Sequence, residues 1–339
     1  MRADLLVGLV APACVLLSTP FVLRWASRGR MLDIPSARSS HEQPTPRGGG
    51  LGIVLGVLLT VGLQLLLGRA LEGVHIALLG GGIVVAVTGW LDDRGGLGSY
   101  VRLGLYGLAS AWAVFWLGGL PSLEFGVGAL HVGGLGYILG WAAIMLLTNL
   151  FNFMDGIDGI AATEAATVGV VSGVLLFLGG DPSLAVLAVS LGLGSAAFLV
   201  WNWHPARIFM GDVGSNFLGF TIAVLAIASE GRHSLPALIW VLLLGVFVVD
   251  GVSTFVRRLL RHKPPHEAHR THAYQGAVQR GYSHSRVTLA VLSIDAVLAA
   301  LALAAWKYPV LLLPSIGGAF LLLLVLHWYY SPLRRPENG

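Results

Sequence analysis

Long apolar runs recur along the chain and are separated by short polar segments. Several runs reach about 18 residues or more, which as an α-helix is enough to cross a hydrocarbon core roughly 30 Å thick. They predict eleven membrane spans, at residues 4–25, 49–68, 74–91, 101–119, 134–151, 160–179, 183–202, 213–229, 236–257, 286–306 and 308–330. Only Lys307 and Tyr308 separate the last two, which can also be read as one broken segment. We therefore expect ten or eleven transmembrane helices in an all-α polytopic membrane protein, formed as a single domain by residues 1–339.

Composition excludes a water-soluble globular protein, because 55% of the residues are hydrophobic, 11% are charged and the mean hydropathy is +0.78. At the N-terminus only Arg2 precedes the first run, and Pro12 lies inside the lipoprotein-type cleavage box before Cys14. We therefore interpret this run as an uncleaved first span rather than a secretory signal. Cys14 is the single cysteine, which excludes an intramolecular disulfide framework, and no zinc-type Cys/His spacing is present.

Basic residues gather in alternate loops, which predicts the orientation. With the N-terminus periplasmic, the cytoplasmic side carries all but four of the 21 lysines and arginines. The C-terminus and a long loop at residues 257–286 are then cytoplasmic, whereas residues 123–132 form a short outer hairpin around Gly126 and Gly128. This asymmetry explains the topology and contact with anionic headgroups of the lipid bilayer, so the pI near 9.5 is no evidence for nucleic-acid binding.

Five carboxylates fall at the predicted cytoplasmic ends of these spans: Asp92, Asp93, Asp155, Asp158 and Asp212. A carboxylate buried near a membrane without a partner costs several kcal/mol, so such a cluster requires a cation. Magnesium binds oxygen ligands from one or two carboxylates and completes its shell with water and substrate phosphates. The cluster therefore predicts phosphate chemistry at a divalent metal site.

Each acidic motif also has a plainer interpretation. Adjacent Asp92 and Asp93 repel each other, which suits a general base or a nucleophile, but alone they are better explained as a solvated pair neutralised by Arg94. Asp155 and Asp158 share one face if their segment is helical, or they cap the helix that starts near Gly159. The combination of motifs favours the functional interpretation.

The third acidic motif lies just before the span at residues 213–229. Asp212 or Ser215 can cap that helix, whose N-terminal amides then face an anion. Asn216 in the same segment is a candidate substrate ligand. As a cap alone the motif is unremarkable, but with the other two clusters it supplies a third wall for a metal and diphosphate site.

The long cytoplasmic loop carries histidines at every third position, at 266, 269 and 272. On a helix they would form one stripe, which is compatible with zinc, but Lys263 and Arg270 favour an anion-binding loop. An ordinary histidine-rich loop remains the alternative.

Four motifs in this order resemble the polyprenyl-phosphate N-acetylhexosamine-1-phosphate transferases, the glycosyltransferase family 4 superfamily, over nearly the full chain. They are Gly89-Trp-Leu-Asp92-Asp93-Arg94, Asn152-Phe-Met-Asp155-Gly-Ile-Asp158-Gly159, Phe209-Met-Gly211-Asp212-Val-Gly214-Ser215 and the His/Arg loop. The segment Pro44-Thr45-Pro46-Arg47-Gly48-Gly49 is similar to a further signature of that family, although turn chemistry alone would explain it.

The resemblance implies a role for each matching residue. Asp212 is implied as a magnesium ligand and Asn152 as a second, with manganese as a possible substitute. Asp92, Asp93, Asp155 and Asp158 match the catalytic acids. His269, Arg270 and His272 are implied to bind the donor, and Arg47 to meet a lipid phosphate. Direct attack, with Asp93 or Asp92 deprotonating the acceptor, is favoured over a covalent intermediate, although the sequence leaves both open.

The substrates implied are undecaprenyl phosphate and a UDP-N-acetylhexosamine, with UMP released. This loop reads His269-Arg270-Thr271-His272, whereas the muramoyl-pentapeptide enzymes have consecutive histidines. It is more similar to the branch that initiates O-antigen or other surface polysaccharides, which implies an N-acetylhexosamine or its 6-deoxy derivative. The expected location is the bacterial inner membrane, with the active site at the cytoplasmic face. The sequence is compatible with a homodimer and does not determine the oligomeric state.

Two other classes of membrane protein fit the sequence less well. A transporter would use acids within spans, as Asp250 and Asp295 are placed, but it predicts polar groups near the midplane of related halves, and no internal repeat is evident. A CDP-alcohol phosphotransferase would carry an Asp-Gly-x-x-Ala-Arg type signature, which is absent.

Overall fold

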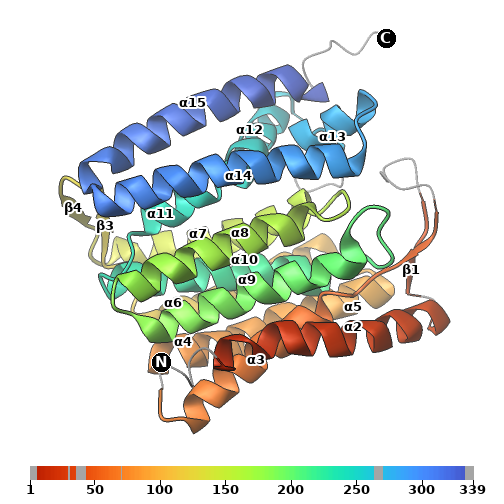
Figure 1. Cartoon of the computed structure of the whole chain (residues 1–339), viewed down its shortest axis with the longest axis horizontal. Helices are drawn as coiled ribbons and strands as arrows, with labels where there is room; N and C mark the ends of the chain where they lie inside the picture. The colour runs from red at the N-terminus through yellow and green to blue at the C-terminus, as the bar shows by residue number, and fades with distance from the viewer. Residues whose placement is uncertain (1–5, 30, 36–42, 70, 263–269, 333–339) are drawn as a thin grey trace.

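The structure is a computed structural model that describes residues 6–29, 31–35, 43–69, 71–262 and 270–332. Long helices running side by side make up most of it (Figure 1). In chain order, the first helices are α2 (Val10–Arg28), α3 (Leu51–Leu66), α4 (Glu72–Ala77), the π-helical turn η1 (Leu78–Gly82), α5 (Ile83–Gly95), α6 (Ser99–Leu117), α7 (Leu135–Met154) and α8 (Ile160–Leu178). They are followed by α9 (Pro182–Asn202), α10 (Asp212–Gly231), α11 (Ala237–Leu243), α12 (Gly245–Leu260), α13 (Ala273–Gln279), α14 (His284–Lys307), the 3-10 turn η2 (Pro309–Leu311) and α15 (Leu312–Tyr330).

The prediction of an all-α polytopic membrane protein is confirmed. Every apolar stretch predicted to span the membrane is helical in the described residues. Eight helices are long and apolar enough to cross a membrane, and α11 with α12 makes a ninth if that bent pair counts as one span. α3 has only 16 residues and α6 is not among the eight, so by length and composition alone the described residues contain eight or nine candidate spans, against the ten or eleven predicted.

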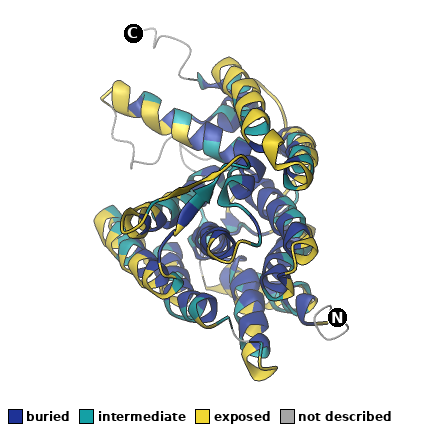
Figure 2. Ribbon diagram, turned by 90° about the vertical axis from the view of Figure 1, so that its left-hand side faces the viewer, coloured by how far each residue is buried: buried dark blue, intermediate teal, exposed yellow. Residues whose placement is uncertain are grey.

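α10 forms the centre of the bundle, because 94% of its most apolar 18 residues are buried, against 17% for the segment that contains α15. Buried residues face inward around this centre and exposed apolar residues face outward (Figure 2). α5 approaches α10 closely, since a Cβ added at Gly89 would lie 2.4 Å from the carbonyl oxygen of Asp212. This contact brings the acids at the end of α5 beside the first residue of α10.

Two small hairpins join the helices. β3 (Ser122–Glu124) pairs antiparallel with β4 (Ala129–His131), which confirms the hairpin predicted for residues 123–132. β1 (Leu32–Asp33) pairs with β2 (Thr45–Pro46), which the sequence did not predict. The second hairpin matters for the site, because it carries the chain to Arg47 at the acidic end of the bundle, the end that holds Asp93, Asp155, Asp158 and Asp212.

A second group of helices lies beside the first. The chain bends by 80° between α11 and α12, and α12 then packs with α13, α14 and α15 (Figure 1). α13 is short and follows the long loop whose residues 263–269 lie outside the described part of the chain. It thereby brings the end of that loop to the acidic end of the bundle.

Candidate active site

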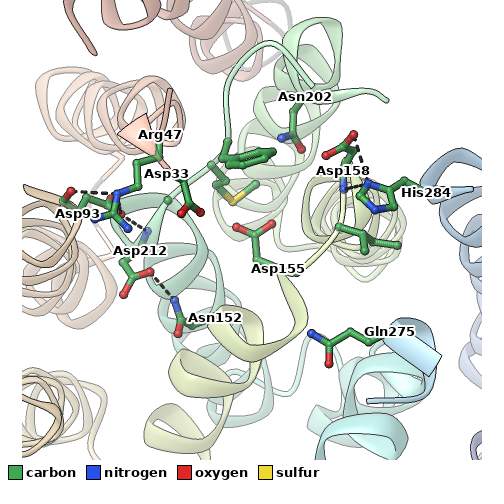
Figure 3. A pocket seen from close by; sticks show the side chains of 15 residues that line it. Asp33, Arg47, Asp93, Asn152, Asp155, Asp158, Asn202, Asp212, Gln275 and His284 are labelled. Carbon is green, nitrogen blue, oxygen red and sulfur yellow. Dashed lines mark hydrogen bonds and ion pairs between the residues drawn. The ribbon is translucent and has the colours of Figure 1, made fainter. Parts of the chain in front are cut away.

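A cavity of about 250 Å³ opens at the acidic end. Its walls come from the ends of α5 and α7, the start of α10, the loop before α8, and α13 (Figure 3). The predicted site residues among its lining are Arg47, Asp93, Asn152, Asp155, Asp158 and Asp212. The structure therefore gathers residues from four separate motifs of the sequence into one cavity.

Asp93 binds the N-terminus of α10 from a neighbouring helix. Its Oδ1 accepts a hydrogen bond from the amide of Asp212 at 3.0 Å, and its Oδ2 accepts one from the amide of Val213 at 3.1 Å. The expectation that Asp212 or Ser215 caps this helix is wrong, since Gly211 is the N-cap residue and its helix has no local side-chain cap. Asp93 supplies the negative charge that a helix N-terminus favours, and its side chain is buried.

Arg102 is the cation that joins the acids. Its Nη1 lies 2.6 Å from Oδ2 of Asp92 and 3.0 Å from Oδ2 of Asp212. Arg94, which the plainer interpretation assigned to this role, instead lies over the ring of Trp90, 4.7 Å from its centroid. Arg102 was not predicted as a site residue, because no motif marks it and its partner Asp212 is 110 positions away.

Asn152 and Asp212, the expected metal ligands, are direct neighbours. Nδ2 of Asn152 donates to Oδ1 of Asp212 at 2.9 Å and to Oγ of Ser215 at 3.2 Å. Both residues lie at ends of helices, Asn152 near the end of α7 and Asp212 at the start of α10. Both residues thus line the cavity from two different helices.

Asp155 projects into the middle of the cavity (Figure 3). No hydrogen bond to its carboxylate is formed by the described residues. Burial raises the pKa of Asp155 well above its usual value, and the nearby charges of Asp212, Asp93 and Asp158 raise it further. A buried carboxylate among other acids is stabilised by a bound cation, so this all-oxygen set fits a hard divalent ion such as magnesium.

The segment that contains Asp155 and Asp158 is a loop, so the expectation of one shared helical face is wrong. The alternative that these acids cap α8 is also wrong, since Gly159 is the N-cap residue, with a left-handed φ of 78° and no side-chain cap. Asp155 ends α7 instead, while Asp158 turns toward a different set of partners.

Asp158 contacts two histidines that were not predicted as site residues, His204 and His284. Its Oδ2 lies 2.6 Å from Nδ1 of His204 and 3.3 Å from Nδ1 of His284, and it accepts a hydrogen bond from the amide of Ala206 at 3.2 Å. Burial acts to raise the pKa of Asp158, but hydrogen bonds from His284 and His204 outweigh it and hold the pKa below its usual value. A carboxylate that binds Nδ1 fixes the orientation of an imidazole, so Asp158 sets one wall of the cavity.

The remaining predicted substrate ligands occupy different positions. Nε of Arg47 donates to the carbonyl oxygen of Asp93 at 3.0 Å, so this residue lines the cavity while anchored to α5. Asn216 is 1% exposed, and its amide donates to the carbonyl oxygen of Asp212, one turn back in α10, so the side chain does not line the cavity. His272 precedes α13 in an extended conformation and is therefore not part of a helical stripe. Arg270 lies two residues earlier, while His266 and His269 lie outside the described residues.

The chain is similar in sequence to known proteins of one family. A family model described as glycosyl transferase family 4 matches residues 75–230. A probable undecaprenyl-phosphate N-acetylglucosaminyl 1-phosphate transferase of Bacillus subtilis is 32% identical, over 84% of this chain and 80% of that protein. A decaprenyl-phosphate N-acetylglucosaminephosphotransferase of Mycobacterium tuberculosis is also 32% identical, over 86% and 80%. An undecaprenyl-phosphate alpha-N-acetylglucosaminyl 1-phosphate transferase of Escherichia coli is 26% identical, over 83% and 77%.

Proposed function

Because the chain belongs to glycosyl transferase family 4, within the superfamily of polyprenyl-phosphate N-acetylhexosamine-1-phosphate transferases, we propose that it transfers an N-acetylhexosamine 1-phosphate from a UDP-sugar to undecaprenyl phosphate. UMP is released, and the product is a sugar linked to the polyprenyl chain through a diphosphate. The observation that carries this proposal is the acid-lined cavity at one end of a membrane-spanning bundle. There a lipid phosphate can reach the acids while its hydrocarbon tail stays in the bilayer.

In the proposed reaction, a phosphate oxygen of the acceptor forms a bond to the sugar-linked phosphorus of the donor. The bond from that phosphorus to the bridging oxygen breaks, and UMP leaves with the electron pair. We propose direct attack rather than a covalent intermediate on Asp93, because a nucleophilic oxygen would have to reach phosphorus, whereas Asp93 is 2% exposed and both of its oxygens accept hydrogen bonds from amides of α10. A base only has to accept a proton, and each of these oxygens keeps a lone pair for that. We assign the role of base to Asp93 rather than Asp92, since only Asp93 lines the cavity.

Magnesium is the proposed cofactor, with Asp212 and Asn152 as ligands and Asp155 facing the same space. When bound, the ion neutralises charge on the donor diphosphate and on the departing UMP. Arg102 holds Asp92 and Asp212 in place, and Asn152 orients Asp212. Arg47 lines the cavity beside Asp93, with its Nε 3.8 Å from Oδ1 of that acid, and is the proposed contact for the acceptor phosphate.

We further propose that the acidic end faces the cytoplasm of a bacterial inner membrane. All but four of the 21 basic residues fall in loops predicted for that side, and UDP-sugars are cytoplasmic substrates. The His/Arg loop, which differs from the consecutive histidines of muramoyl-pentapeptide enzymes, supports a UDP-N-acetylhexosamine or 6-deoxy donor. The proposed reaction would then initiate the synthesis of O-antigen or another surface polysaccharide.

The test is UMP release by the purified protein with undecaprenyl phosphate, magnesium and a panel of UDP-sugars, UDP-N-acetylglucosamine first. We expect release to require the lipid and to stop with a chelator and recover with magnesium or manganese. Asp212→Ala and Asp93→Ala should each lower kcat at least 100-fold, because each removes a group from the cavity wall.

Asp181→Asn is the matched control, since Asp181 is equally buried but caps α9 at the other end of the bundle. It should retain activity within about threefold. Folded wild-type protein that releases UMP from no UDP-sugar would contradict the proposed function and favour the transporter interpretation.

A further inference from the structure

Asp250 is a buried carboxylate that the acid-lined cavity does not use. It lies on α12, six residues beyond the bend at Leu244, and is 6% exposed. It does not line the cavity that contains Asp93 and Asp212. A buried carboxylate needs charged or hydrogen-bonding partners. Thr254 on α12 itself donates to Oδ1 of Asp250 at 3.2 Å, and the other partners come from two other elements.

The first partner is α13. Oδ1 of Asp250 accepts a hydrogen bond from the amide of Ala273 at 2.9 Å, and Oδ2 accepts one from the amide of Tyr274 at 3.2 Å. Oδ1 also lies 3.3 Å from Nδ1 of His272. Asp250 therefore binds the first two amides of α13 together with the histidine that precedes them.

The second partner is α15. His327 is 3% exposed, and its Nδ1 lies 3.2 Å from the same Oδ1 of Asp250. α13 also rests directly on the end of α15, since a Cβ added at Gly276 would lie 2.1 Å from the carbonyl oxygen of Tyr330. One carboxylate thus ties together α12, α13 and the last helix of the chain.

α13 in turn contacts the acid-lined cavity. The hydroxyl of Tyr274 donates to the carbonyl oxygen of Phe153 at 3.0 Å, and a Cβ added at Gly156 would lie 2.1 Å from that hydroxyl. Gln275, the next residue, lines the cavity (Figure 3). The position of α13 therefore sets the wall beside Asp155.

We propose that Asp250 and His327 are positioning residues of the transferase, which hold α13 so that Tyr274 supports the Phe153–Gly156 turn and Gln275 lines the cavity that takes the donor. This inference rests on the proposed function. Neither residue touches the reacting groups, and both act through α13. Because a small misplacement of a binding group lowers the rate strongly, loss of either contact should lower kcat/KM for the donor.

The kinetic test compares Asp250→Asn and His327→Ala with matched controls from distant parts of the bundle. Asp181→Asn changes an equally buried acid, and His75→Ala changes a histidine that is 1% exposed and contacts Gln64. We expect Asp250→Asn and His327→Ala to lower kcat/KM for the UDP-sugar at least tenfold, with KM for undecaprenyl phosphate changed less than twofold. His327→Gln, which keeps a hydrogen-bond donor, should recover part of the loss, and the controls should stay within about threefold.

A labelling test detects displacement of α13 without measuring enzyme activity. Ala277 on α13 is 9% exposed and lines a groove beside α14, so a cysteine placed there in a Cys14→Ser background is a shielded reporter. N-ethylmaleimide should label Ala277→Cys at least five times faster when Asp250→Asn or His327→Ala is added, and no faster with Asp181→Asn or His75→Ala. Unchanged labelling, or an equal loss for both substrates, overturns the proposal. Absence of UMP release by the wild type instead overturns the transferase function, and the labelling still decides whether Asp250 and His327 hold α13.

Discussion

At the scale of single residues, we expect substitution of Arg102 to lower activity, because among the described residues it alone bridges Asp92 and Asp212. Hydrogen bonds to charged groups contribute about 1.5–3 kcal/mol, so Arg102→Ala should lower kcat/KM for UMP release roughly 10- to 100-fold. Arg102→Lys keeps the charge but loses the planar guanidinium, so its kcat/KM should lie between those of the wild type and Arg102→Ala. Arg94→Ala is the control, since Arg94 stacks on Trp90 and should leave the rate nearly unchanged. Equal effects of the two alanine variants would show that Arg102 has no special role.

The sequence predicted the acids of the site but not the residues that hold them. Asp93, Asp155 and Asp212 stand out because carboxylates are costly at membrane ends and because glycines flank two of them. Arg102, His204 and His284 are ordinary in sequence. Arg102 is ten positions from Asp92 but 110 from Asp212, and the two histidines are 46 and 126 positions from Asp158. Such pairings depend on which helices become neighbours, and a hydrophobic pattern does not encode that.

At the scale of elements, Gly89 determines how closely α5 approaches α10. An added Cβ would lie 2.4 Å from a backbone oxygen of Asp212, which cannot move aside as a side chain can. Gly89→Ala should therefore force the helices apart, with a cost of about 1–3 kcal/mol, a lower Tm in detergent and a loss of UMP release. Gly104→Ala in α6, where an added Cβ meets nothing within 4 Å, should hold or raise Tm, because alanine favours a helix. A Tm for Gly89→Ala equal to that of the wild type would contradict the close contact.

Apolar runs predicted where the helices lie, but not how each is bent. The stretch at residues 236–257 reads as one span, whereas the structure breaks it by 80° between α11 and α12. The sequence also did not decide the conformation of the segment after α7, since a three-residue spacing of acids fits a helix as well as a turn. At the loop after α7 a tertiary contact holds the turn, because the hydroxyl of Tyr274 donates to the carbonyl oxygen of Phe153, 121 positions away in the sequence.

At the scale of the whole molecule, the proposed reaction requires the acidic end to face the cytoplasm, where UDP-sugars are available. Two exposed positions at opposite ends of the bundle test this in a Cys14→Ser background. Gly128→Cys in the β3–β4 hairpin should react with a membrane-impermeant maleimide in intact spheroplasts, whereas Gln279→Cys at the end of α13 should react only after the membrane is opened. The opposite pattern would place the acids on the side without nucleotide sugars, and the basic residues against the positive-inside rule. Because the basic loops and the acid-lined cavity lie at the same end, a single topology must satisfy both charge distribution and substrate supply.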